Sequence, residues 1–180
     1  QPRHRCDREQ AVYVPDQGCV VRYAIEVRDR EGRLVMPALV SVRLFSSARA
    51  AREHFESGLR PLAAAVLGRP EVAPFAAPVA LIETLCMTAS LFPIDGDLPT
   101  LVRATDPAAM LEVLRGTLGL ANGIPFAPTG CRVDVAHYPR QHHCVLRYAL
   151  TNGSESQPLI VYGKIAGDDR GAVTMAAVPE

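Results

Sequence analysis

The sequence predicts an α+β fold in which a helix packs across an antiparallel sheet. Apolar and polar side chains alternate in residues 19–27, which is the period of a half-buried strand. The turn sequence 29–32 and the β-forming run 38–45 follow, and together they predict an antiparallel hairpin. A helix-forming run begins at Ala48, and the strand pattern of 19–27 recurs at 144–150. We therefore expect a sheet-plus-helix unit, a helical connector and a second, partial copy of the same hairpin unit.

The other strands of the first half are predicted from β-forming runs that Pro and Gly interrupt. Residues 11–14 indicate a short first strand after a polar segment, 1–10, that we expect to fray. Residues 78–85 and 87–92 indicate two more strands, joined tightly near residue 86. The predicted order is three strands, a helix and two strands.

The helix of the first half has a recognisable start and an interruption. Ser46 and Ser47 precede it, and a hydroxyl in that place is typical of an N-cap. Gly58 and Pro61 interrupt its middle, which predicts either a kink or a second helix with Pro61 in its first turn. The apolar stripe expected to lie on the sheet contains Phe55, Leu59, Leu62 and Val66.

A second helix is predicted from Asp106 onward. Asp106 is the expected cap, Pro107 suits the first helical position, and Gly119 is the expected stop. The apolar stripe of this helix contains Met110, Leu111, Leu114 and Leu118.

The hairpin pattern occurs twice, which indicates an internal duplication of a domain-sized unit. Cys19 to Ile25 match Cys144 to Leu150 at five of seven positions. By the same alignment Arg43 occupies the place of Lys164. We expect three parts: a cap-like first unit at 1–103, a helical connector at 104–130, and a partial second unit at 131–180, whose last residues hold at most a ragged strand or a first helical turn.

Composition excludes two classes of partner. The chain of 180 residues has 19 Lys and Arg against 19 Asp and Glu, so no net charge attracts it to nucleic acid or to an anionic membrane. Its apolar stretches are shorter than the roughly 20 residues of a membrane helix. The five cysteines include no Cys-x-x-Cys pair, which favours a reduced, cytoplasmic setting. Because the sequence begins at Gln1, we expect a fragment of a longer polypeptide.

Three short motifs carry a family resemblance. They are Cys-Val-Leu-Arg-Tyr at 144–148, Val-Tyr-Gly-Lys at 161–164 and Leu-Phe-Pro-Ile-Asp at 91–95. They resemble the aminoglycoside phosphotransferase and maltokinase-like family over roughly residues 13–165. The resemblance implies a kinase-like small lobe in which Lys164 holds the α- and β-phosphates of ATP, with Mg²⁺, and a glutamate on the following helix steadies it.

The sequence also departs from that family. Glu180 is the only glutamate after Lys164, and no His-Gly-Asp-x-x-x-x-Asn element is present. The string Asp95-Gly-Asp97 has an aspartate in place of the histidine and Val102 in place of the asparagine, so we expect a turn there. The given sequence therefore lacks the catalytic loop, and we expect it to be inactive by itself.

Several basic side chains are candidates for phosphate contacts. Residues 138–143 correspond to the loop that covers phosphates in kinases, but they contain no glycine, so side chains such as Arg140 would make the contacts. Arg147 joins Lys164 and Arg140 in the candidate ATP site, although a solvated or cross-strand-paired role fits Arg147, and its equivalent Arg22, equally. Lys164 itself is either a phosphate anchor or a solvated strand residue.

Two further clusters have structural interpretations. Arg43 is expected to pair with Glu53 or Glu56 on the following helix. His142, His143 and Cys144 suggest a metal site, but successive strand residues point to opposite faces and do not converge on one ion.

Two hypotheses follow for function. In the first, the chain is the N-terminal region of a small-molecule kinase-like phosphotransferase, and a C-terminal kinase lobe or a partner protein supplies the catalytic aspartate. In the second, the duplicated unit is a non-catalytic binding or protein-interaction module that uses open strand edges. A cystatin-like scaffold, with one helix on a curved sheet, is a third option that the first copy alone satisfies.

Overall fold

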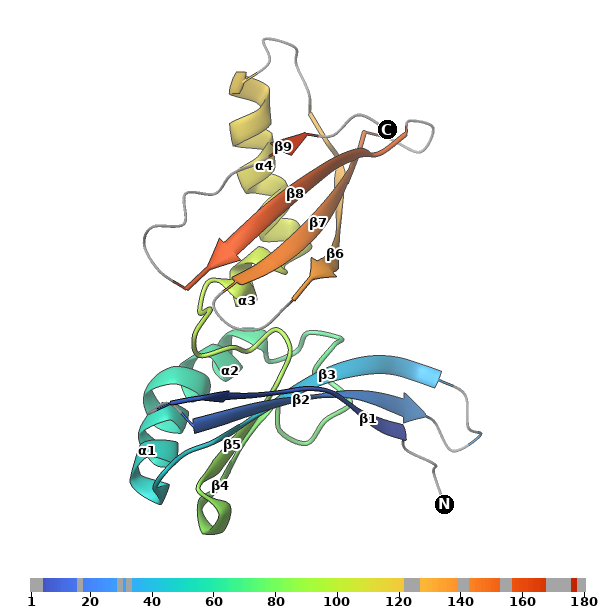
Figure 1. Cartoon of the computed structure of the whole chain (residues 1–180). Helices are drawn as coiled ribbons and strands as arrows, with labels where there is room; N and C mark the ends of the chain where they lie inside the picture. Colours follow the sequence, from blue (N-terminus) through green and yellow to red (C-terminus); the bar gives the residue numbers. More distant parts are fainter. Residues whose placement is uncertain are drawn as a thin grey trace. The chain divides into compact units, whose positions relative to one another are not determined.

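The chain folds into two compact units, residues 1–99 and 100–180. The computed structural model describes residues 5–15, 18–28, 31, 34–121, 127–138, 143–152, 157–167 and 176–177. Both units combine helices with antiparallel sheet, which confirms the predicted α+β class (Figure 1). Among these residues there is no helix of the length and hydropathy needed to span a bilayer. The predicted division into a cap-like unit, a connector and a second unit, with boundaries at residues 103 and 130, stays a prediction. The compactness of a unit does not show what that unit does.

The first unit contains a five-stranded antiparallel sheet with the strand order β1-β2-β3-β5-β4. The predicted order along the chain, with a helix between the third and fourth strands, is confirmed. The expectation that residues 1–10 fray is wrong for 5–10, because backbone pairing with β2 holds this polar segment in β1. The strands are β1 (Arg5–Val14), β2 (Gly18–Arg28), β3 (Leu34–Leu44), β4 (Val79–Ile82) and β5 (Met87–Leu91).

The predicted interruption of the first helix takes the form of a π-helical turn. Helix α1 (Ala48–Glu53) begins at Ser47, whose Oγ accepts a hydrogen bond from the backbone N–H of Ala50 at 3.2 Å. The π-turn (His54–Leu59) leads into α2 (Arg60–Val66), which has Pro61 in its first turn. Proline lacks the N–H that an uninterrupted α-helix requires, so the wider turn accommodates it.

The helix covers the sheet face that carries Thr88. The imidazole Nδ1 of His54 lies 3.3 Å from Thr88 Oγ1, and Thr88 is paired with Arg43 in the neighbouring strand. Thr88 and Ser90 are buried on this face. Because strand residues alternate between faces, the opposite face carries apolar side chains that are half-exposed: Val21, Tyr23, Ile25, Val40 and Val42.

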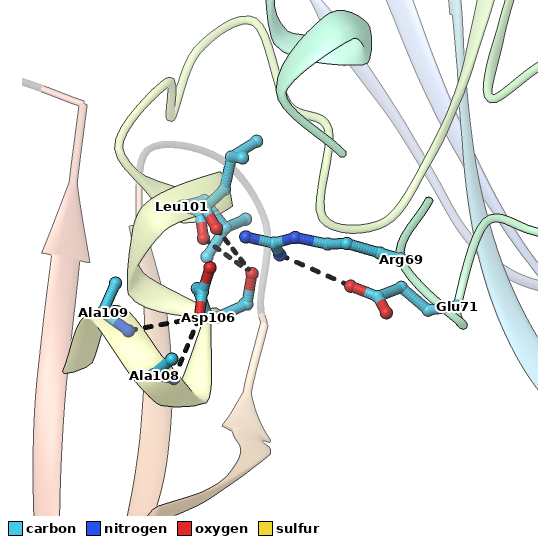
Figure 2. Close-up of polar contacts among 8 residues, drawn as sticks. Arg69, Glu71, Leu101, Asp106, Ala108 and Ala109 are labelled. Atoms are coloured by element: carbon cyan, nitrogen blue, oxygen red, sulfur yellow. Dashed lines mark hydrogen bonds and ion pairs between the residues drawn. The ribbon is translucent and has the colours of Figure 1, made fainter. Parts of the chain in front are cut away.

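The second unit begins with two helices, α3 (Leu101–Ala104) and α4 (Pro107–Ala121). Asp106 Oδ1 accepts hydrogen bonds from the backbone N–H groups of Ala108 and Ala109 at 2.9 and 3.2 Å, which confirms the predicted cap (Figure 2). The predicted stop at Gly119 is wrong, since α4 continues through it to Ala121. Glycine inside a helix costs only about 1 kcal/mol relative to alanine, so it does not by itself end one.

The second sheet is also antiparallel, with the order β6-β7-β8-β9. The strand pattern predicted at 144–150 lies within β7, and β6 and β8 pair with β7 on either side. The strands are β6 (Gly130–His137), β7 (His143–Thr151), β8 (Leu159–Ala166) and β9 (Ala176–Ala177).

Tyr148 anchors the second sheet to its helices. Its hydroxyl donates a hydrogen bond to the backbone carbonyl of Ala104 at 3.0 Å, and its side chain is almost fully buried. Burial raises the pKa of the Tyr148 hydroxyl far above its ordinary range, so the group remains a donor. Gly163 lies beneath the ring, where a Cβ atom would stand 2.9 Å from Tyr148 Cε2. The glycine beside Lys164 is thus explained by packing.

The two hairpins share one pairing register. Cys19 is opposite Leu44 in the first, and Cys144 is opposite Ile165 in the second. One step further, Val20 faces Arg43 and Val145 faces Lys164. The sequence alignment that makes Arg43 and Lys164 equivalent is therefore matched by the strand geometry.

Replacing Gly163 by alanine should destabilise the second unit by about 1–3 kcal/mol, because the new methyl group displaces the Tyr148 ring from a packed position. The measurement is the free energy of unfolding from urea titration.

A matched control is Gly116→Ala on α4, where the added methyl group meets no atom within 4 Å. This change should raise the unfolding free energy by about 0.5–1 kcal/mol. Equal effects of the two substitutions would contradict the packing role of Gly163.

Candidate functional site

Lys164 lies exposed on β8, in the last row that pairs all three strands β6, β7 and β8 before β6 ends. It is paired with Val145 of β7, which is paired with His137, the last residue of β6. Paired residues of neighbouring strands share a face of the sheet. Lys164, Val145 and His137 therefore form one row on the same face.

A second row of this face contains the other described candidate, Arg147. Asp134, Arg147 and Tyr162 are paired across β6, β7 and β8. Arg147 Nη1 lies 3.4 Å from Asp134 Oδ2, and the same oxygen accepts from Arg132 Nε at 3.1 Å. The cross-strand pairing considered for Arg147 is confirmed, and Asp134 offsets part of its positive charge.

We call this surface the lysine face and define it by the two rows just described: His137, Val145, Lys164, Asp134, Arg147 and Tyr162. Tyr148, whose hydroxyl bonds α3, lies on the opposite face because it alternates with Arg147 along β7. The helices therefore pack on the Tyr148 side of the sheet. Arg140, the third candidate, lies outside the described residues.

Two histidines flank the turn at the end of the lysine face. The ring centroids of His137 and His143 are 6.4 Å apart, with 53° between the ring planes. Cys144 is fully buried, and the alternation of β7 places it on the face opposite His143. Within the described parts of the chain, no three or more His, Cys, Asp or Glu residues are grouped so that they could hold a metal ion.

In the first unit, Arg43 occupies the position equivalent to Lys164, and its positive charge is neutralised by an ion pair. The guanidinium of Arg43 forms two hydrogen bonds with the Asp97 carboxylate, Nη1 to Oδ1 at 3.1 Å and Nη2 to Oδ2. The expected pairing of Arg43 with Glu53 or Glu56 is wrong: Asp97 takes that place, and Glu56 pairs with Arg60. A bidentate pair fixes the orientation of the guanidinium and leaves less of its charge for a ligand.

Asp97 belongs to the turn that was expected at residues 95–97. The Oδ1 atom of Asp95 accepts a hydrogen bond from the backbone N–H of Asp97 at 2.8 Å, which confirms the predicted turn. The pairing partner was not predictable from sequence, because 54 positions separate Arg43 from Asp97 and no periodic pattern links them.

His54 is packed against the same turn. A Cβ atom on Gly96 would stand 2.8 Å from His54 Nε2, so only glycine permits this approach. Phe45 covers the imidazole from another side, with ring centroids 5.1 Å apart. Burial lowers the pKa of His54, the positive charge of Arg43 lowers it further, and Asp97 and Asp95 act in the opposite direction.

The first unit should lose stability as the pH falls through about 6.5, the ordinary pKa of histidine. Because the pKa of His54 is lowered in the folded chain, the unfolded chain binds the proton more readily, and protonation favours unfolding. Urea unfolding at pH 8.0 and pH 5.5 measures the change. His54→Gln should reduce this pH dependence, and an unchanged dependence in the variant would contradict the assignment.

Comparisons of the chain with protein-family models, with curated proteins and with solved structures gave no match in any of the three.

Proposed function

We propose that the second unit is the strand part of an ATP-binding lobe in a small-molecule kinase-like phosphotransferase. The observation that carries the proposal is the position of Lys164, which is exposed on the third strand of an antiparallel meander and lies in the last row that pairs all three strands before the first strand ends. Kinases hold the phosphates of ATP with a lysine on the third strand, under the loop that joins the first two. The family resemblance of the 144–148 and 161–164 motifs points to the same role.

The charges near Lys164 support an anionic ligand. The acidic residue of the lysine face, Asp134, is one row away and contacts both Arg132 and Arg147. Lys164 is thus the cation of this face best placed to meet a phosphate, and Arg147 contributes at longer range. Arg140 belongs to the same proposal by its position in the sequence.

The remaining parts of the reaction are proposed to come from elsewhere. Phosphoryl transfer needs Mg²⁺ to offset charge on the phosphates and a carboxylate to orient the acceptor hydroxyl. We propose that a C-terminal kinase lobe, or a partner protein, supplies them. The first unit then serves as a cap, in which Asp97 neutralises the residue equivalent to the ATP-binding lysine.

A non-catalytic binding module is the second candidate. It is favoured by the apolar face of the first sheet, where Val21, Tyr23 and Val42 are half-exposed. On the same face, Leu44 is 38% exposed and Tyr13 at the edge is 73% exposed. Apolar surface of this kind is typical of protein interaction sites.

Millimolar MgATP should raise the melting temperature of the chain, and Lys164→Ala should remove the effect. Ligand at about ten times its Kd stabilises the folded state by about 1.4 kcal/mol, which corresponds to about 3 °C for a chain of this size. Differential scanning fluorimetry with and without MgATP measures the shift.

The matched control is Arg132→Ala, an exposed cation of the same sheet that pairs with Asp134. It should keep most of the shift. If MgATP causes no shift in the parent chain, or the same shift in Lys164→Ala, the nucleotide site is not where we propose it, and the binding-module candidate gains support.

A further inference from the structure

We propose that the imidazoles of His137 and His143 bind the phosphate oxygens of the same nucleotide and make its binding stronger at acidic pH. This inference rests on the proposed function, because it assigns two further ligands to the site of Lys164. It also makes nucleotide binding at this site depend on pH, which a lysine alone does not do.

The strand register brings the two histidines to Lys164. His137 shares a row with Lys164, with Val145 between them, and His143 is paired with Ala166, two residues along β8 from Lys164. Such diagonal neighbours on one face lie about 7–8 Å apart at their backbones, within reach of long side chains. The two rings are 6.4 Å apart, which allows one polyphosphate to contact both.

The local charge favours an anion over a metal cation. Two imidazoles are good metal ligands, but here an exposed ammonium group lies on the same face. The nearest acidic residue in the strand register, Asp134, is engaged by two arginines. Within the described strand rows, a cation would meet repulsion from Lys164 and no free carboxylate that offsets it. A phosphate, in contrast, is attracted by the positive charge of Lys164.

The turn sequence explains why side chains are needed. Kinases cover the phosphates with a glycine-rich loop whose backbone approaches the ligand closely. Residues 138–143, Tyr-Pro-Arg-Gln-His-His, contain no glycine. Imidazolium N–H groups at the two strand ends that flank this turn can donate the hydrogen bonds that backbone amides donate in kinases.

Histidine changes charge between about pH 5 and pH 8, so these donors respond to pH. The described charged groups that face them are Lys164 on β8, Arg147 on β7 and Asp134 on β6, with Tyr162 in the second row. A bound polyphosphate next to the rings favours their protonated form, which couples proton uptake to nucleotide binding.

The test is calorimetric titration of MgATP into the whole chain at pH 6.0 and pH 8.0, at constant ionic strength, for the parent and for His137→Gln/His143→Gln. Titration of the ligand itself is common to both proteins and cancels in the comparison. At pH 6.0 the parent should bind about tenfold more tightly than the double variant, as expected for an added charge-assisted hydrogen bond. At pH 8.0 the two should agree within about twofold.

The controls separate this inference from the proposed function. His54→Gln, in the other unit, should bind like the parent at both pH values. If Lys164→Ala abolishes binding while the double variant equals the parent at pH 6.0, the histidine pair is excluded and the lysine site stands. If the parent binds no MgATP at either pH, both proposals are overturned. Each single histidine variant, tested alone, should retain part of the pH dependence, and full retention in both would also overturn the inference.

Discussion

The contact between the Tyr148 ring and Gly163 determines which face of the second sheet is buried. Tyr148 bonds the carbonyl of Ala104 and needs the space that a glycine leaves on β8, so the helices pack on its side. Residues of a paired strand alternate between faces, and Lys164 follows Gly163 directly. The packing of one aromatic ring therefore requires the ammonium group to lie on the opposite, exposed face.

The two hairpins use the same register but bury opposite faces. In the first unit the helix lies on the face of Thr88 and Arg43, and Tyr23, the equivalent of Tyr148, is half-exposed. In the second unit the helices lie on the Tyr148 side, and Lys164 is exposed. The half-buried basic position, Arg43, has a bidentate carboxylate partner, because a charge that is partly removed from water needs one. Lys164, which is exposed to water, does not require a carboxylate partner.

The sequence predicted the elements better than their packing. Alternation in 19–27 and 144–150, the Ser47 and Asp106 caps and the break at Pro61 are local signals, and each appears in the structure. The extent of β1 was missed because backbone pairing with β2 outweighs the polarity of its side chains. The Arg43 partner was missed because a long-range ion pair leaves no periodic trace. Of the candidate site, the alternation along β7 indicated that Arg147 and Tyr148 lie on opposite faces, whereas the approach of the His137 and His143 rings depends on the register shift between Val135 and His137.

An exposed lysine on a strand costs little to keep, so its presence alone does not indicate a ligand. The distribution of the neighbouring charges is what favours a phosphate over a cation. Asp134, one row away from Lys164, already contacts two arginines. The end of the sheet beside the turn carries the ammonium group of Lys164 and the imidazoles of His137 and His143. An anion at this end of the sheet is attracted by the ammonium charge and by each imidazole that carries a proton. Under the proposed function, this attraction is the reason why a polyphosphate is expected to bind beside Lys164.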